Sequence, residues 1–301
     1  MASSTPASVA ETAEAVPAAP PPGSIAQWLR LLGRTKTALF GLVLAISVLL
    51  GAALAPWIAP EDPLAMSGKR LAPPSAQAWL GTDQFGRDLG SRLLYGARIS
   101  VVVSFAAVTS AVALGGAAGL VAGYFEGWVD HLLMRAADVL MAFPTFLLAL
   151  AVVATLGASL PNLVVAIGLA YVPIFSRVVR GSVLSVKQND FVQAVRALGA
   201  SDTRIMVHAI LPSVLAPVIV QATFNLSTAI MIEAALSFLG LGVQPPTPSW
   251  GTMLSEARSF MELDPWLAVA PGTAITTAVL GFNLFGDGLR DLLDPRLRGE
   301  R

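Results

Sequence analysis

The stretch "VLMAFPTFLLALAVVATLGASLPNLVVAIGLAYVPIFS", residues 139–176, contains no Asp, Glu, Lys or Arg. A helix needs about 20 apolar residues to cross the hydrocarbon core of a bilayer. This run is therefore too long for one membrane-spanning helix and long enough for two. We place the break at "GASLPN", residues 157–162, where Gly, Pro and Asn favour a turn.

The composition of the whole chain supports an integral membrane protein. Of its 301 residues, 55% are hydrophobic and 13% are charged, whereas soluble domains carry roughly 25% charged residues. The formal net charge is zero, so no basic surface for nucleic acid is expected. The absence of cysteine excludes disulfides, thiolate catalysis and Cys-ligated metals. We expect no metal site, because the two histidines, His131 and His208, are far apart in the sequence.

Six membrane spans are predicted from the uncharged runs, which makes the chain an all-α polytopic protein with both termini on one side. The first 24 residues, rich in Ala, Pro and Ser, are predicted to form a disordered cytoplasmic tail. Four glycines on the second span, at positions 115, 116, 119 and 123, predict close helix packing. The predicted spans are 37–60, 99–125, a third from about 132 to the break at 157, a fourth from 162 to 176, 211–235 and 265–285.

The distribution of cations predicts the orientation, because Lys and Arg accumulate in cytoplasmic loops. With the N-terminus inside, all but six of the 19 cations lie on the cytoplasmic side. The six outside are Lys69, Arg70, Arg87, Arg92, Arg98 and Arg258. We therefore expect a multi-pass membrane protein with cytoplasmic N- and C-termini.

The sequence offers this chain no energy source of its own. A phosphate-binding loop needs lysine in a Gly-Lys-Ser/Thr context, and none of Lys36, Lys69 and Lys187 has one. A secondary transporter would use ionisable groups within the membrane, but no predicted span has a charge at its centre. Asp138 and Glu233 lie near span ends. A passive pore, or a pore driven by a partner, remains.

The polar stretch "DFVQAVRALGASDTRIMVHAILP", residues 190–212, separates the predicted fourth and fifth spans. It predicts two short helices joined at Gly199, with Ser201 or Asp202 capping the second. Phe191, Val195 and Leu198 share one face of the first helix. This apolar stripe must be buried, against the protein's own span ends, in the lipid interface, or against a partner.

The same stretch resembles the cytoplasmic EAA loop of permease subunits in binding-protein-dependent ABC importers. That motif has Glu-Ala-Ala, a glycine after three more residues, and Leu-Pro further on. Here Gln193, Ala194 and Val195 take the first three positions, Gly199 the glycine, and Leu211-Pro212 the end. A literal Glu-Ala-Ala at residues 233–235 lacks the glycine spacing and the Leu-Pro pair.

Several further stretches resemble the dipeptide/oligopeptide/nickel branch of this family, in its second-permease (DppC/OppC-like) subunit. They are "WLGTDQFGRDLGSRLLYGARIS" (79–100), "ADVLMAFPTFLLAL" (137–150), "EAALSFLGLGVQPPTPSWGTML" (233–254) and "GDGLRDLLDPRLRG" (286–299). The resemblance implies the transmembrane domain of a type I ABC importer. It divides the chain into the tail (1–24), an N-terminal span with the start of an outer loop (25–78), a permease domain (95–290) with a coupling loop (185–212), and a cytoplasmic C-terminus (291–301).

The resemblance also implies the partners and the site. A second, non-identical permease, two ATP-binding subunits and an extracytoplasmic binding protein would join this chain at the lipid of the inner membrane, which the resemblance implies as its location. ATP and magnesium would be bound by the ATPase subunits, and no cofactor by this chain. The docking residues implied are Asp190, Phe191, Gln193, Ala194, Val195, Arg196, Leu198, Gly199, Ala200, Ser201, Asp202, Arg204, Leu211 and Pro212. Asn225 and Pro144 are candidate pathway-lining residues. The solute would be a di- or oligopeptide, with nickel complexes or glutathione as alternatives; an ion-gradient transporter is the competing class.

Overall fold

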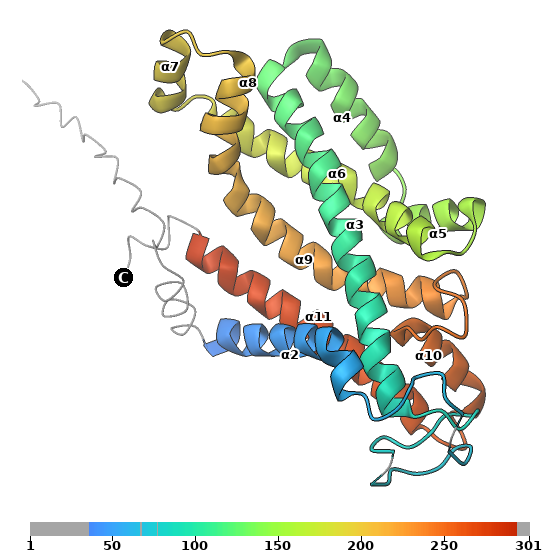
Figure 1. Ribbon diagram of the computed structural model, residues 1–301. Helices are drawn as coiled ribbons and strands as arrows, with labels where there is room; N and C mark the ends of the chain where they lie inside the picture. Colours follow the sequence, from blue (N-terminus) through green and yellow to red (C-terminus); the bar gives the residue numbers. More distant parts are fainter. Residues whose placement is uncertain (1–35, 67, 77, 294–301) are drawn as a thin grey trace, which may run out of the picture.

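The computed structural model describes residues 36–66, 68–76 and 78–293, and its regular structure there is helical (Figure 1). An isolated β-bridge between Thr82 and Asp88 is the one exception within those ranges. The predictions for the tail at 1–24 and for 294–301 lie outside the described residues.

Five helices are long and apolar enough to cross a membrane. They are α2 (Lys36–Ile58), α3 (Leu89–Phe125), α6 (Leu160–Val186), a helix from Asp202 to Phe238 that includes α9 (Leu211–Phe238), and α11 (Trp266–Leu293). The shorter elements are α4 (Gly127–Met141), α5 (Thr145–Leu156), α7 (Asp190–Ala197), α8 (Asp202–Arg204), η1 (Ile205–Ile210), α10 (Trp250–Ala257) and η2 (Arg258–Phe260).

The predicted third span is not one straight helix. It is divided between α4 and α5, which are bent by 86° at residues 142–144, and there are six spans only if this pair counts as one. Pro144 is the physical cause, because it has no N–H for the helical ladder and disfavours a helical backbone at Phe143. The turn predicted at 157–162 is confirmed: Gly157 ends α5 at φ 89°, and Ser159 caps α6.

The second span begins ten residues before its predicted start at Ile99. The side chain of Asp88 caps α3 by accepting a hydrogen bond of 2.6 Å from the backbone N–H of Ser91. Since α3 has 37 residues and a bilayer requires about 20, the helix extends beyond the hydrocarbon core.

Helix α3 packs along α6 through the predicted glycine face. A Cβ atom on Gly115 or Gly119 would collide with backbone carbonyl oxygens of α6, those of Val172 and Ser176. Gly116 points away from this interface, and a Cβ atom there would have no neighbour within 4 Å. The close approach of the two backbones therefore requires glycine, which has no side chain, at positions 115 and 119. Helix α9 contacts α3, α6 and α11, and α2 runs beside α11 (Figure 1).

The start of α3 and helix α10 lie at the end of the bundle opposite α7 and α8 (Figure 1), and a charge cluster joins them there. It consists of Asp83, Arg87, Arg92 and Glu256. Arg87 and Arg92 each donate to Glu256 Oε2 at 2.9 Å, and both contact Asp83 Oδ2, at 2.5 and 3.3 Å. The cluster thereby joins the loop before α3 to α10.

Arg92→Met is expected to lower the free energy of unfolding by about 3 kcal/mol, because it breaks a buried ion pair and leaves Asp83 and Glu256 to share the charge of Arg87. The side chain of Arg92 is almost completely buried. Arg258→Met, which removes an exposed arginine at the same end of the bundle, is the matched control. Thermal unfolding of the detergent-solubilised chain measures both. Equal melting temperatures for the two variants would contradict a structural role for the cluster.

Candidate functional site: the loop between α6 and α9

Helix α7 ends in a hydrogen-bonded turn at Gly199. The N–H of Gly199 donates to the carbonyl of Arg196 at 3.0 Å, and the N–H of Ala200 donates to that of Val195 at 3.4 Å. This pair of bonds defines a Schellman turn, which requires a left-handed residue after the helix. Gly199 has φ 77° and supplies this left-handed residue.

The second predicted helix is not separate from the fifth span. One turn of α8 continues through the π-helix η1 into α9, so the helix is continuous from Asp202 to Phe238. Pro212 has no N–H, which interrupts α-helical hydrogen bonding at this point. The N–H of Leu211 instead donates to the carbonyl of Met206, five residues back, and the wider π spacing carries the chain past the proline. Ser201 is the N-cap residue by position, without a capping side-chain bond.

Tyr124, the penultimate residue of α3, anchors this loop. Its hydroxyl donates to Asp202 Oδ1 at 2.6 Å, and its backbone carbonyl accepts from Lys187 Nζ at 2.6 Å. Lys187 also pairs with Glu126 at 2.7 Å. Both ends of the loop are thus tied to the end of α3.

Gln193, which occupies the acidic position of the EAA motif, has a local structural role. Its Nε2 donates to the carbonyl of Lys187 at 2.9 Å, where α6 ends. This bond closes the turn between α6 and α7 without any ion pair. The replacement of the acidic residue is therefore compatible with the shape of the loop.

The loop divides its apolar residues between two directions. Val192, Ile205 and Ile210 are buried and hold α7 against η1. Phe191 and Leu198 face outward, and Leu198 is 87% exposed. The predicted stripe of Phe191, Val195 and Leu198 is therefore not buried against the protein's own span ends; only Val195 is partly buried. The exposed part is an apolar surface on a rigidly held helix.

The remaining loop residues complete this surface. Asp190, Ala194, Arg196, Ser201 and Arg204 are exposed, as is Pro212 at the start of α9, while Ala200 and Leu211 are partly buried. The guanidinium of Arg196 lies 5.8 Å from the ring centroid of Tyr124. Among the described residues no group of three or more His, Cys, Asp or Glu side chains could hold a metal ion.

The two candidate pathway residues lie on separate elements. Asn225 is buried on α9 and accepts a hydrogen bond of 3.0 Å from Gln221 Nε2. Thr228, one turn further on, accepts from the hydroxyl of Tyr171 on α6 at 2.8 Å. Pro144 is exposed at the α4–α5 bend, and α5 packs on α6. The polar stripe thus follows α9 through Gln221, Asn225 and Thr228.

Three carboxylates in the span helices have defined partners. Glu233 lies five residues before the end of α9, as expected near a span end, but it is fully buried and accepts from Ser237 at 2.8 Å. Asp130 on α4 pairs with Arg180 on α6, and Asp138 pairs with Arg177. The expectation that buried titratable groups are missing is therefore wrong for Glu233, because exposure depends on the packing of α9 and not on its position in the span.

Sequence reasoning did not single out Tyr124 and Gln221 as functional. The position of Tyr124 could have identified it, since an aromatic residue at the end of a span is typical of a membrane interface. Gln221 could have been identified by its spacing, since it lies four residues before Asn225 and two polar side chains at this spacing are neighbours on a helix.

Comparisons with known proteins give matches over most of the chain. Residues 115–299 match the family described as binding-protein-dependent transport system inner membrane component, and residues 25–74 match the N-terminal TM domain of oligopeptide transport permease C. The dipeptide transport system permease protein DppC of Alkalihalophilus pseudofirmus is 46% identical over 290 residues, covering 94% of this chain and 95% of the relative. The glutathione transport system permease protein GsiD of Escherichia coli is 44% identical over 275 residues, covering 91% of both chains.

Proposed function

The chain belongs to the family of binding-protein-dependent transport system inner membrane components, and from this premise we propose how it works within its complex. It is a permease subunit, not an enzyme, of an importer for peptides or related solutes. A second, non-identical permease forms the other half of the pathway. Two ATPase subunits bind ATP and magnesium, and an extracytoplasmic protein delivers the solute.

The α6–α9 loop is the surface on which an ATPase subunit docks. The observation that carries this proposal is the outward position of Phe191 and Leu198 on a segment that is hydrogen-bonded to Tyr124 on both sides. Large apolar side chains that project beyond a span are unfavourable in water, and a partner's cleft would bury them. Since η1 continues into α9, a displacement of the docked loop would move α9 and its polar stripe.

The solute is a di- or oligopeptide or a related molecule such as glutathione. The names of the two relatives support this range. Nickel complexes remain the alternative within the family. Family membership argues against an ion-gradient transporter, even though Glu233 is a buried carboxylate in α9.

Leu198→Asp is expected to weaken docking of the ATPase subunits by about tenfold, since a charge replaces an apolar side chain in the buried contact. The matched control is Leu263→Asp, because Leu263 is also largely exposed, at 75%, but lies between η2 and α11. Co-purification of the ATPases with each variant measures docking, and uptake by the reconstituted complex measures its consequence. Normal co-purification with Leu198→Asp would overturn the proposed docking surface.

Single cysteines test the proposed orientation, because the chain has none of its own. Asn189 and Ser75 are both exposed and are placed by the cation distribution inside and outside, respectively. An impermeant thiol reagent applied to intact cells is expected to label Ser75→Cys and to spare Asn189→Cys until the membrane is opened. The reverse pattern would refute a cytoplasmic N-terminus.

A further inference from the structure

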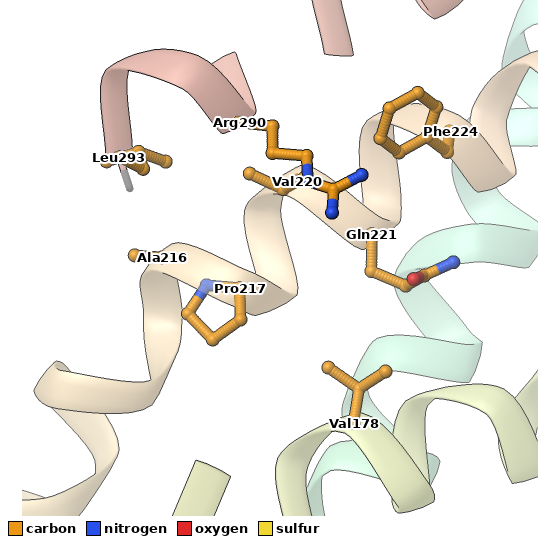
Figure 2. A pocket seen from close by; sticks show the side chains of 8 residues that line it. All are labelled: Val178, Ala216, Pro217, Val220, Gln221, Phe224, Arg290 and Leu293. Atoms are coloured by element: carbon orange, nitrogen blue, oxygen red, sulfur yellow. The ribbon is translucent and has the colours of Figure 1, made fainter. Parts of the chain in front are cut away.

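A pocket opens between α6, α9 and α11 near the end of the bundle that carries the α6–α9 loop (Figure 2). Its volume is about 540 Å³, within the range of about 300–1,000 Å³ that is usual for small-molecule sites. Most of its wall is apolar. The lining residues are Val178, Ala216, Pro217, Val220, Gln221, Phe224, Arg290 and Leu293.

Arg290 supplies the only cationic group among the described residues that line this pocket. It reaches from α11 across α9, toward Val220 and Gln221 (Figure 2). Within the part of the chain that the structure describes, it forms no ion pair, although Asp287 and Asp291 lie on the same helix. A guanidinium presents a planar set of N–H donors that matches a carboxylate.

Gln221 adds a polar group that a peptide bond can use. Its Nε2 donates to Asn225 Oδ1 at 3.0 Å, so the Oε1 of Gln221 remains an acceptor. Asn225 is buried and does not line the pocket, so its part is to hold the side chain of Gln221 in place. The Oε1 of Gln221 is thereby available to accept a hydrogen bond from the N–H of a peptide group.

We propose that this pocket is a solute subsite that binds the terminal carboxylate of a peptide on Arg290 and its adjacent peptide group on Gln221. The inference rests on the proposed function and names the feature of the solute that the permease itself recognises. The polar stripe of α9 supports a transported solute over a lipid, because it continues from the pocket into the bundle through Thr228 and Tyr171. A lipid headgroup would need only the cation at the pocket's edge.

The test measures binding of radiolabelled dialanine and of its C-terminal amide to the complete complex in nanodiscs, without the binding protein. The wild type is expected to prefer the carboxylate by about tenfold, the usual strength of a charge-assisted hydrogen bond. Arg290→Met should remove the preference, and Arg290→Lys should retain part of it. Arg135→Met, which removes an exposed arginine from α4 outside the pocket, should leave the preference unchanged.

Gln221→Leu is expected to weaken binding of dialanine and its amide alike, by about threefold, since it removes the contact to the shared peptide group. A loss of folded protein would lower the binding of both ligands equally, so the ratio of the two affinities does not depend on it. Size-exclusion chromatography checks the amount of folded protein separately.

A second arm compares nanodiscs of phosphatidylcholine with nanodiscs that also contain phosphatidylglycerol. Loss of dialanine binding to the wild type in phosphatidylglycerol would assign Arg290 to the headgroup phosphate and overturn the proposal. If the wild-type complex imports dialanine but Arg290→Met keeps the carboxylate preference, the subsite is wrong and the proposed function stands. If the wild type with ATP imports none of peptides, glutathione and nickel complexes, both proposals fall.

Discussion

Replacing Gly199 by valine is expected to reduce solute uptake and solute-stimulated ATPase activity together, by at least about tenfold. Gly199 has φ 77°, and the Schellman turn after α7 depends on this conformation. A left-handed backbone costs an ordinary residue about 1–2 kcal/mol, and a β-branched residue tolerates it worst. Nothing lies within 4 Å of a Cβ at this position, so the effect comes from the backbone and not from a clash.

The control for this variant is Gly199→Asn, because asparagine enters the left-handed region more readily than other side chains. It adds a side chain of similar size and should retain most of the uptake. The membrane spans are untouched in both variants, so the inserted subunit should be present at normal levels. Uptake is measured in proteoliposomes, with co-purification of the ATPases as the readout of docking. Normal transport by an assembled Gly199→Val complex would show that the shape of this loop does not couple the ATPases to the pore.

Gly119→Val is expected to prevent the isolated subunit from folding into a monodisperse form. A Cβ at this position would collide with the carbonyl oxygen of Ser176 and would lie 2.9 Å from the Cβ of Val179. The opposing atoms belong largely to the backbone of α6, which cannot move aside as a side chain can. Overpacking of this kind costs about 1–3 kcal/mol and sometimes more, and the α3–α6 contact is the most extensive in the bundle.

Gly116→Val provides a close control, since it places the same side chain on the same helix with nothing within 4 Å. Both variants are compared by the fraction recovered as a single species in detergent and by their melting temperatures. Equal recovery would mean that α3 and α6 can separate without loss of the fold, and that the glycine face is not needed for their packing.

The spans and their turns could be predicted because their signals are local. An uncharged run longer than about 20 residues predicts a span wherever its partners lie. Gly157 and Ser159 end one helix and begin the next through their own backbone preferences. Pro144 gives an equally local signal, but proline is tolerated in membrane helices. Whether it bends or divides a helix depends on its neighbours, so the sequence alone predicts a single helix for the third span.

The conformation of the α6–α9 loop was similarly available from the sequence. The position of Gly199 after an eight-residue helix predicts a left-handed turn, because few other residues adopt positive φ at low cost. The π-helical start of the fifth span was not predicted. It depends on how the wider hydrogen-bond spacing before Pro212 fits the packing of Ile205 and Ile210.

Only the tertiary structure decided which side of each helix is covered. Helical periodicity grouped Phe191, Val195 and Leu198, but Val192 is the residue that is buried. The charge cluster joins Arg87 to Glu256 across 169 positions of the chain, and the α9 pocket requires Arg290 from one helix and Gln221 from another. A periodic pattern specifies which side chains share a face. The partner of that face depends on how the helices pack, and this arrangement is set by contacts between residues far apart in the sequence.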